Sequence, residues 1–403
     1  MELASPSASA IPLATDEALD APGWIRNRVL CSLVLVGIAV AFGLAFLTQA
    51  PNRLVSGVGI PLADLLSGWR WLVLLPAALL AAAVFLPPSR PLHWLVLLAA
   101  AASLFGWVWL AGDQAALAAA TAESPLIRTS FGGGFWVLTV LCALAAADAL
   151  QRLQLNALSR TLAGVVVVLP LLFLLLQGHL DALSLLKEYA NRQDVFQSAW
   201  RRHLQIVLYT LIPTLLIGVP LGVAAFRRQR IAAPLFTLLN LIQTVPSIAL
   251  FGLLMAPLAA VALWWPGSGI SGIGLTPAVL ALTLYSLLPI VHSTVTGLRQ
   301  VPDAVVESAT GMGLTPRQIF WRVEVPLALP LLVAGIRTTT VQAVGLAVVA
   351  ALIGAGGFGA IMFQGLLSSA LDLVLLGVLP VVALAVAIDA LFQSLSVFLR
   401  TTP

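Results

Sequence analysis

Ten stretches of the sequence are apolar enough and long enough to be transmembrane helices. A helix needs about 20 apolar residues to cross a hydrocarbon layer of about 30 Å. The stretches are 29–47, 69–86, 92–111, 134–150, 161–178, 204–226, 231–257, 277–298, 328–352 and 373–394. This pattern predicts an all-α polytopic membrane protein.

The polar segments between these spans divide the chain. Residues 1–27 lack a basic start, which argues against a signal peptide and for a disordered cytoplasmic tail. An accessory block of about five transmembrane helices follows at 28–180. Residues 181–203 form an amphipathic external linker, in which Glu188 and Arg192 are spaced i, i+4. A second five-helix block occupies 204–398.

Orientation follows from the arginines, because short cytoplasmic loops collect basic residues. With the N-terminus inside, the cytoplasmic segments hold most of the basic residues. Tryptophans fall near the predicted helix ends, as an interfacial belt requires. We therefore expect both chain termini on the cytoplasmic side.

Composition narrows the class of protein further. The chain has 403 residues, 60% hydrophobic and 9% charged, whereas soluble proteins have about 25% charged residues. The net charge of +4 comes from scattered arginines, with no run typical of nucleic-acid binding. Cys31 and Cys142 lie in separate apolar runs without a partner motif. These features exclude a soluble enzyme and give no reason to expect nucleic acid as a partner.

The loop at 301–326, between the eighth and ninth spans, predicts two short helices. Pro302 suits the first position of one helix, and Gly313 is placed to end it. Thr315 is a natural N-cap for the second helix, and Gln318 completes a capping box. We expect that helix to end before Pro326.

The second short helix has a partly apolar face, formed by Ile319, Phe320 and Val323. A loop helix of this length has no membrane in which to bury such a face. We therefore expect the face to enter a groove of a partner protein.

Glu307, Ala309, Gly313 and Val325-Pro326 of this loop resemble the EAA loop of ATP-binding-cassette importer permeases. The family pattern is E-A-A, three residues, G, nine residues and I-x-L-P, and the spacing agrees throughout. Ser308, Val323 and Val325 are mild departures. The resemblance implies a coupling helix for the ATPase subunit, with contacts from Glu307, Ser308, Ala309, Gly313, Thr315, Pro316, Arg317, Gln318, Ile319 and Phe320.

Further segments resemble one branch of that family, the osmoprotectant permeases for glycine betaine, choline and carnitine. They are 203–223, 240–254 and 334–359, so the resemblance covers roughly residues 200 to 395. The added spans of the first half are similar to a long-extension subtype of betaine permease.

This resemblance implies a type I importer core in a bacterial cytoplasmic (inner) membrane. The expected partners are ATPase subunits, a second permease subunit, identical or not, and an external substrate-binding protein. No cofactor or metal is expected on this chain, since ATP-Mg belongs to the ATPase partner.

Several motifs for other chemistry fail on their context. Lys187 is the only lysine in the sequence and no glycine loop surrounds it, so a P-loop is absent. The glycines Gly354, Gly356 and Gly357 fit a dinucleotide fingerprint, but a long apolar helix precedes them instead of a strand. They predict a glycine-rich bend at the outer end of the ninth span, which could let helices move.

Polar residues within the second block are candidates for the pathway or gate. Arg337 lies well inside a span, where a charge costs about 2.5–3.5 kcal/mol on insertion scales. We expect it to pair within the core or to reach the cytoplasmic face. The full set of candidates is Asn240, Gln243, Arg337, Gln342, Gly354, Gly356 and Gly357.

The pair Trp264-Trp265 allows either a cation–π site for a quaternary ammonium or a membrane anchor, and the anchor is favoured.

The sequence is compatible with more than one transported solute. Glycine betaine or a related quaternary ammonium compound is the leading prediction, because the core spans carry amides and hydroxyls but few acids. Methionine, sulfonate or phosphonate is an alternative. An ATP-independent secondary transporter is less favoured, because residues 29–178 and 204–394 show no matching broken helices.

Overall fold

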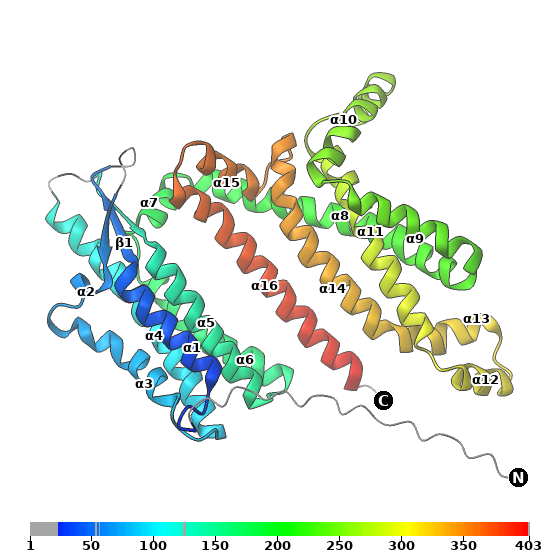
Figure 1. The fold of residues 1–403 in the computed structure, drawn as a ribbon. Coiled ribbons are helices and arrows are strands. Elements are labelled where there is room, and N and C mark those ends of the chain that lie inside the picture. Colours follow the sequence, from blue (N-terminus) through cyan, green and yellow to red (C-terminus); the bar gives the residue numbers. More distant parts are fainter. Residues whose placement is uncertain (1–22, 53–54, 56, 123, 125, 402–403) are drawn as a thin grey trace, which may run out of the picture. The chain divides into compact units, whose positions relative to one another are not determined.

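The computed structural model describes residues 23–52, 55, 57–122, 124 and 126–401, and it is predominantly helical (Figure 1). The elements as far as residue 191 are α1 (Arg28–Gly43), β1 (Ala45–Ala50), β2 (Val58–Pro61), α2 (Leu62–Leu65), η1 (Gly68–Leu74), α3 (Leu75–Ala83), α4 (Arg90–Thr121), β3 (Arg128–Phe131), α5 (Gly133–Leu153), α6 (Ala157–Leu176) and α7 (Ser184–Asn191). The remaining elements are α8 (Gln193–Arg227), α9 (Gln229–Thr244), α10 (Ser247–Trp264), α11 (Leu275–Arg299), α12 (Asp303–Gly311), α13 (Pro316–Ile319), η2 (Phe320–Glu324), α14 (Val325–Val349), η3 (Ala350–Ile353), α15 (Phe358–Leu367) and α16 (Leu371–Thr401).

Eight helices among the described residues are long and apolar enough to cross a membrane. They start at Arg90, Gly133, Ser159, Gln193, Ser247, Leu275, Pro316 and Leu371. The prediction of a helical polytopic membrane protein is therefore confirmed, and seven of the ten predicted spans correspond to one helix each.

The other three predicted spans differ from the structure. The apolar helices at Arg28–Gly43 and Gly68–Ala83 are shorter than 18 residues. The span predicted at 231–257 is broken between α9 and α10, because Pro246 has no N–H to continue a helix and restricts Val245 to an extended conformation. Apolar composition alone did not predict where these helices end.

The chain divides into two compact units, and each is described separately. The first contains residues 1–46, 61–107 and 133–154, and the second contains 47–60, 108–132 and 155–403. This division differs from the predicted accessory block at 28–180, because the end of α4, β3 and α6 belong to the second unit.

In the first unit, α1 packs against α3 and α5. The ring of Phe46 is fully buried and meets Trp107 at 5.9 Å and Phe135 at 5.6 Å between centroids. Residues 1–22 of the predicted cytoplasmic tail lie outside the described residues. Its described end is ordered, since the Trp24 ring stacks on Phe85 at 5.3 Å.

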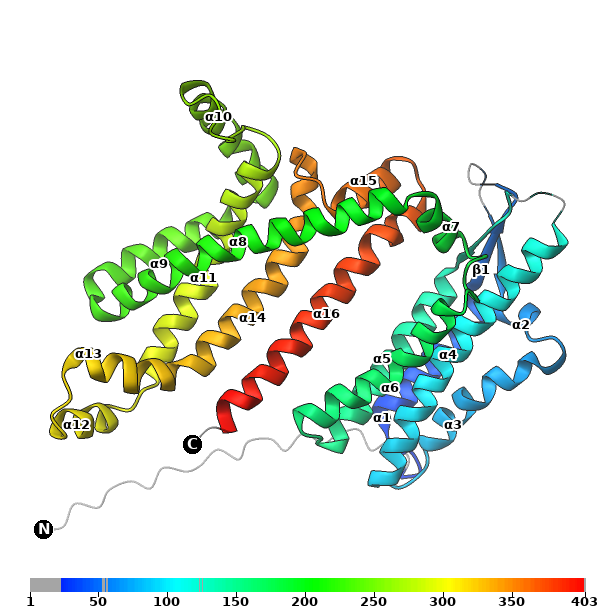
Figure 2. The ribbon, with the colours of Figure 1, turned by 180° about the vertical axis from the view of Figure 1, so that it is seen from behind.

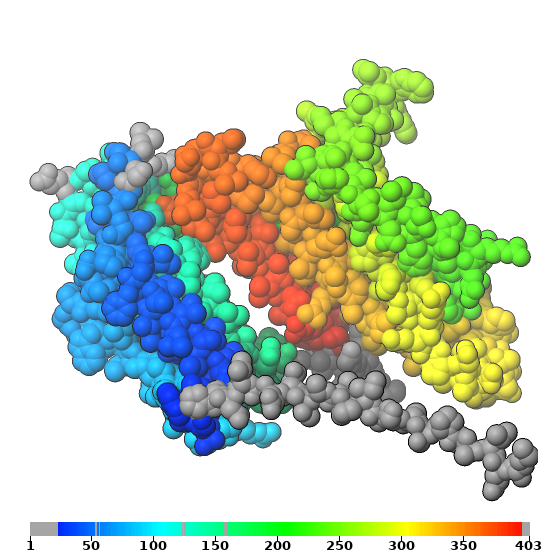
Figure 3. Space-filling model, in the orientation of Figure 1, coloured from blue at the N-terminus to red at the C-terminus, as the bar shows by residue number. Residues whose placement is uncertain are grey.

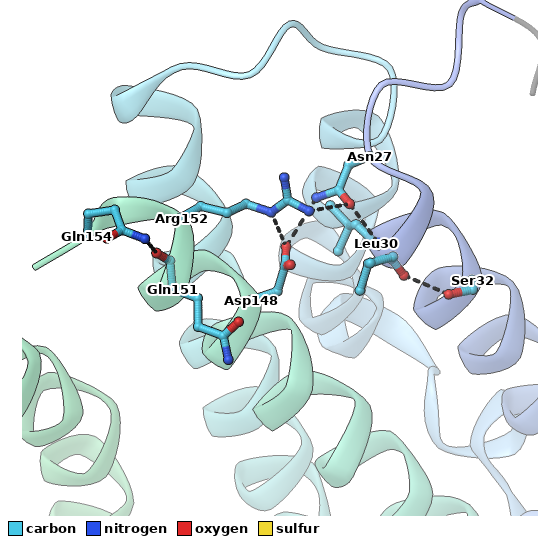
Figure 4. A network of polar contacts seen from close by, with 8 residues as sticks. Asn27, Leu30, Ser32, Asp148, Gln151, Arg152 and Gln154 are labelled. Atoms are coloured by element: carbon cyan, nitrogen blue, oxygen red, sulfur yellow. Dashed lines mark hydrogen bonds and ion pairs between the residues drawn. The ribbon is translucent and has the colours of Figure 1, made fainter. Parts of the chain in front are cut away.

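A polar network fixes the start of α1 to the end of α5 (Figure 4). Asn27 accepts the N–H of Leu30 at 3.0 Å as an N-cap and donates to Asp148 at 3.2 Å. Arg152 donates to the same carboxylate oxygen of Asp148 at 2.8 Å. Three side chains therefore satisfy one another at this helix end.

The second unit includes a small β-sheet that the sequence did not predict, in which β1 and β3 are antiparallel. The strand order is β2-β1-β3, and Leu47 of β1 is opposite Phe131 of β3. These strands are short and lie in segments predicted to be loops. They are not long apolar stretches, so the hydropathy pattern does not predict them.

Polar contacts join β3 to α7 and α16 within the second unit. Glu188 is buried and forms ion pairs with Arg128 at 3.6 Å and with Arg192 at 3.4 Å. Burial, and then the charge of Arg128, lower the pKa of Lys187 from its ordinary value. The predicted i, i+4 contact of Glu188 with Arg192 is present, but the linker at 181–203 is divided, because α8 already begins at Gln193.

The core of the second unit lies between α8, α11, α14, α15 and α16. Helix α8 runs from α7 and α15 toward α9 (Figure 2). Small residues permit the close contact of α8 with α11, since a β-carbon at Gly222 would lie 2.6 Å from Thr294.

Candidate functional site

The predicted coupling loop forms a two-helix segment, which we call the coupling segment and define as residues 303–324. It consists of α12, a short turn, α13 and η2, and lies at the end of α14 opposite α15 (Figure 1). The space-filling view shows this segment, in yellow, on the molecular surface (Figure 3).

The turn between the two helices is a Schellman motif. Gly313 has a φ of 81°, in the left-handed region that favours glycine. Its N–H donates to the carbonyl of Thr310 at 2.9 Å, and the N–H of Leu314 donates to the carbonyl of Ala309 at 3.2 Å. The predicted helix-ending role of Gly313 is confirmed, whereas Pro302 is the N-cap instead of the first helical residue.

The capping box predicted for the second helix is present. The N–H of Gln318 donates to the Thr315 hydroxyl at 3.4 Å, and the N–H of Thr315 donates to Oε1 of Gln318 at 2.8 Å. The two ends of the turn are thus each fixed by local hydrogen bonds.

The second helix does not end before Pro326, so that expectation is wrong. It passes through the π-helical turn η2 into α14, in one continuous helix from Pro316 to Ile353. The N–H of Val325 donates to the carbonyl of Phe320, five residues back. The wider turn accommodates Pro326, which has no N–H for an α-helical bond. The turn η2 therefore joins α13 to α14 without a break.

A long-range ion pair holds η2 against the end of α8. Glu324 is buried, and Arg227 pairs with its carboxylate. The Arg227 guanidinium also lies 5.4 Å from the centroid of the Phe320 ring, a cation–π distance. Sequence reasoning missed this contact because its partners are 97 positions apart.

The exposed face of the coupling segment differs from the predicted one. Ile319 and Ala309 are buried within the chain, so they pack the segment and are not available to a partner. Met312 and Trp321 are instead 75% and 61% exposed. Neither of these two residues was among the predicted contacts. The predicted contact residues that are exposed are Glu307, Ser308, Gly313, Thr315, Pro316, Arg317 and Gln318, and Phe320 is half-buried.

Polar candidates of the pathway take separate places. Gln243 donates to the backbone carbonyl of Tyr285 at 2.9 Å, and the Tyr285 hydroxyl donates to the carbonyl of Val245. These bonds hold α11 at the break between α9 and α10. Asn240 is exposed on α9, and Gln342 is half-buried on α14.

Arg337 pairs inside the second unit, which was one of the two expectations for this residue, the other being that it reaches the cytoplasmic face. Its Nε donates to Oδ1 of Asp389 on α16 at 2.6 Å, and Gln393 donates to the other carboxylate oxygen at 2.8 Å. The pair joins α14 to α16 and offsets the cost of each charge in a span.

The glycine-rich bend predicted after the ninth span is present between η3 and α15. Gly354, Gly356 and Gly357 have φ values of 79°, 84° and 76°. Arg202 of α8 donates to the carbonyl of Ala355 at 2.8 Å and holds the bend in place. A role for this bend in helix movement stays a prediction.

Together, the long apolar helices define a polytopic helical membrane protein, with the exposed coupling segment at one end of α14. Comparison with known proteins gives the particular family. Residues 199–400 match the family described as binding-protein-dependent transport system inner membrane component. Residues 26–186 match the family described as ABC transporter permease YehY, N-terminal domain. The chain belongs to the first of these families and is a permease of the ATP-binding-cassette importer class.

Several relatives are named as osmoprotectant, carnitine or choline permeases. The chain is 39% identical over 198 residues to the osmoprotectant import permease protein OsmW of Salmonella typhimurium, covering 49% of this chain and 88% of that protein. It is 36% identical to the carnitine transport permease protein OpuCD of Listeria monocytogenes, covering 53% and 90%. It is 38% identical to the choline transport system permease protein OpuBB of Bacillus subtilis, covering 46% and 80%.

Proposed function

We propose that this chain is the permease subunit of an ATP-driven importer for glycine betaine or a related quaternary ammonium osmoprotectant. The observation that carries the proposal is the similarity to osmoprotectant, carnitine and choline permeases over 80–90% of their lengths. Carnitine and choline share a trimethylammonium group. The scarcity of acids in the core spans supports this class over metal ions or polyamines, which would want acids in the pathway.

The coupling segment is the proposed contact for the ATPase subunit. Its exposed surface combines Met312, Pro316, Arg317 and Trp321, and its continuous helix leads into α14. Closure of two ATPase subunits around ATP would shift this segment and, through α14, turn the pathway outward. ATP-Mg would be bound by the ATPase, not by this chain.

Orientation and assembly complete the proposal. Both termini and the coupling segment lie on the cytoplasmic side of a bacterial inner membrane, consistent with the distribution of arginines. A second permease subunit, identical or different, forms the other half of the pathway. An external binding protein delivers substrate to the opposite side.

Uptake of labelled glycine betaine tests the proposal. The permease is expressed with its own ATPase and binding protein in cells lacking their other betaine systems. We expect labelled glycine betaine to accumulate until ATP is depleted. Unlabelled carnitine or choline should reduce this uptake by competition. ATP-dependent accumulation of methionine, a sulfonate or a phosphonate, with betaine at background, would leave the importer assignment and refute the osmoprotectant one.

A further inference from the structure

A hollow lined by aromatic side chains lies where α7 meets the start of α8. The hollow is shallow and open at the surface, has a volume of about 550 Å³, and is lined by Tyr189 of α7 and by Phe196, Gln197, Trp200 and Arg201 of α8. This volume is within the range of about 300–1,000 Å³ that is typical of small-molecule sites. The hollow is at the α15 end of α14, opposite the coupling segment (Figure 1).

Packing on a buried ring holds the aromatic walls in place. Phe358 of α15 is fully buried, and its ring centroid lies 5.2 Å from that of Phe196 and 5.6 Å from that of Trp200. The Tyr189 ring meets Phe196 at 5.1 Å and 89°. Rings in such T-shaped contacts turn their faces in different directions, so the hollow presents aromatic surface from more than one side.

One cation at the edge of this hollow is uncommitted. Nearby Arg192 pairs with Glu188, and Arg202 donates to Ala355. Arg201 is exposed and, within the described part of the chain, has no hydrogen-bond or ion-pair partner for its guanidinium. The hollow therefore combines aromatic faces with a free donor for an anionic group.

We propose that this hollow binds a small zwitterion that carries a quaternary ammonium and a carboxylate, a step that rests on the proposed function. The ammonium lies against Trp200 and its aromatic neighbours, where a cation–π contact is favourable and needs no hydrogen bond. The carboxylate accepts hydrogen bonds from Arg201. Such a site holds the substrate at the end of the core away from the ATPase contact, beside the bend at Gly356 that Arg202 also contacts.

Isothermal titration calorimetry tests the site. Glycine betaine and choline are each titrated into the purified full chain and its variants in nanodiscs. Trp200→Ala should raise the Kd of both ligands about fivefold. Arg201→Gln should raise the Kd of glycine betaine by a similar factor and leave that of choline unchanged, because choline has no carboxylate. Trp200→Phe keeps an aromatic face and should retain most of the affinity, which shows that the site is still folded.

Matched controls are Trp264→Ala, at an exposed tryptophan of α10, and Arg228→Gln. Neither should change either Kd. The neutral isostere 3,3-dimethylbutan-1-ol should not compete with choline. The site is refuted by undetectable binding to the wild-type chain, by a wild-type Kd for glycine betaine in both Trp200→Ala and Arg201→Gln, or by competition from the isostere.

ATP-dependent uptake by the same variants, with ATPase and binding protein, separates this proposal from the proposed function. Uptake of glycine betaine together with unchanged Kd values refutes the hollow and leaves the importer assignment. Binding that responds to the variants as predicted supports the hollow even where no quaternary ammonium compound is accumulated, an outcome that refutes the proposed function alone.

Discussion

Replacing Arg227 by Met tests how the coupling segment is held. The side chain of Arg227 is 46% exposed, and it pairs with Glu324, whose side chain is 7% exposed. Methionine removes the charge while it keeps a long apolar side chain beside Phe320. The variant therefore leaves a buried carboxylate of η2 without its counter-ion.

The magnitude follows from the burial of the two partners. Breaking a buried ion pair costs about 3–5 kcal/mol, and exposed pairs contribute only about 0–1 kcal/mol. Because one partner is buried and the other half exposed, we expect about 2 kcal/mol. That corresponds to roughly a 30-fold shift toward a detached segment, since about 1.4 kcal/mol is a factor of ten.

Hydrogen exchange measured by mass spectrometry reads out this shift in the purified chain. Amides of residues 317–324 should exchange up to about 30-fold faster in Arg227→Met, because local opening sets their protection. Arg228→Met is the matched control, since Arg228 is exposed and has no ion pair within the described residues. Unchanged exchange in Arg227→Met, or equal acceleration in the control, would refute the role given to this pair.

Three further experiments test the turn at Gly313, the pair Arg337–Asp389 and the contact of α8 with α11. Gly313→Val should strain the left-handed turn by more than about 1–2 kcal/mol, so membrane insertion persists while uptake and stimulated ATP hydrolysis are lost; full transport would contradict this. Arg337→Met should lower stability by about 1–3 kcal/mol in thermal unfolding, and adding Asp389→Leu should restore most of it, because the unpaired carboxylate is the cost; no recovery would argue against the pairing. Gly222→Val should cost about 1–3 kcal/mol by forcing Thr294 aside, and an unaltered melting temperature would disprove the close contact of α8 with α11.

Local signals explain the parts of the site that the sequence predicted. The capping box and the left-handed glycine depend on residues within a few positions of one another, so Thr315, Gln318 and Gly313 could be recognised without a structure. The resemblance to the family pattern then supplied the prediction of a coupling role for this loop. Long apolar stretches likewise identified the helices that match single spans.

Tertiary contacts account for what the sequence did not predict. The pairs Arg227–Glu324 and Arg337–Asp389 join positions 97 and 52 residues apart, and no periodicity connects them. Pro326 predicts a helix end because its missing N–H breaks an α-helical ladder, but a π-helical turn removes that conflict. Ile319 is buried by tertiary contacts within its own chain. The pattern of apolar residues along a helix does not predict such contacts.

Cross-linking from position 316 tests the coupling assignment most directly. A photoreactive amino acid replaces Pro316 in one variant and Gln197, near the start of α8, in a second variant, each in the complex with ATPase and binding protein. We expect a cross-link to the ATPase subunit from position 316 that changes in yield on ATP addition, and none from position 197. Cross-links to the ATPase from position 197 but not from 316 would contradict both the coupling segment and the proposed orientation.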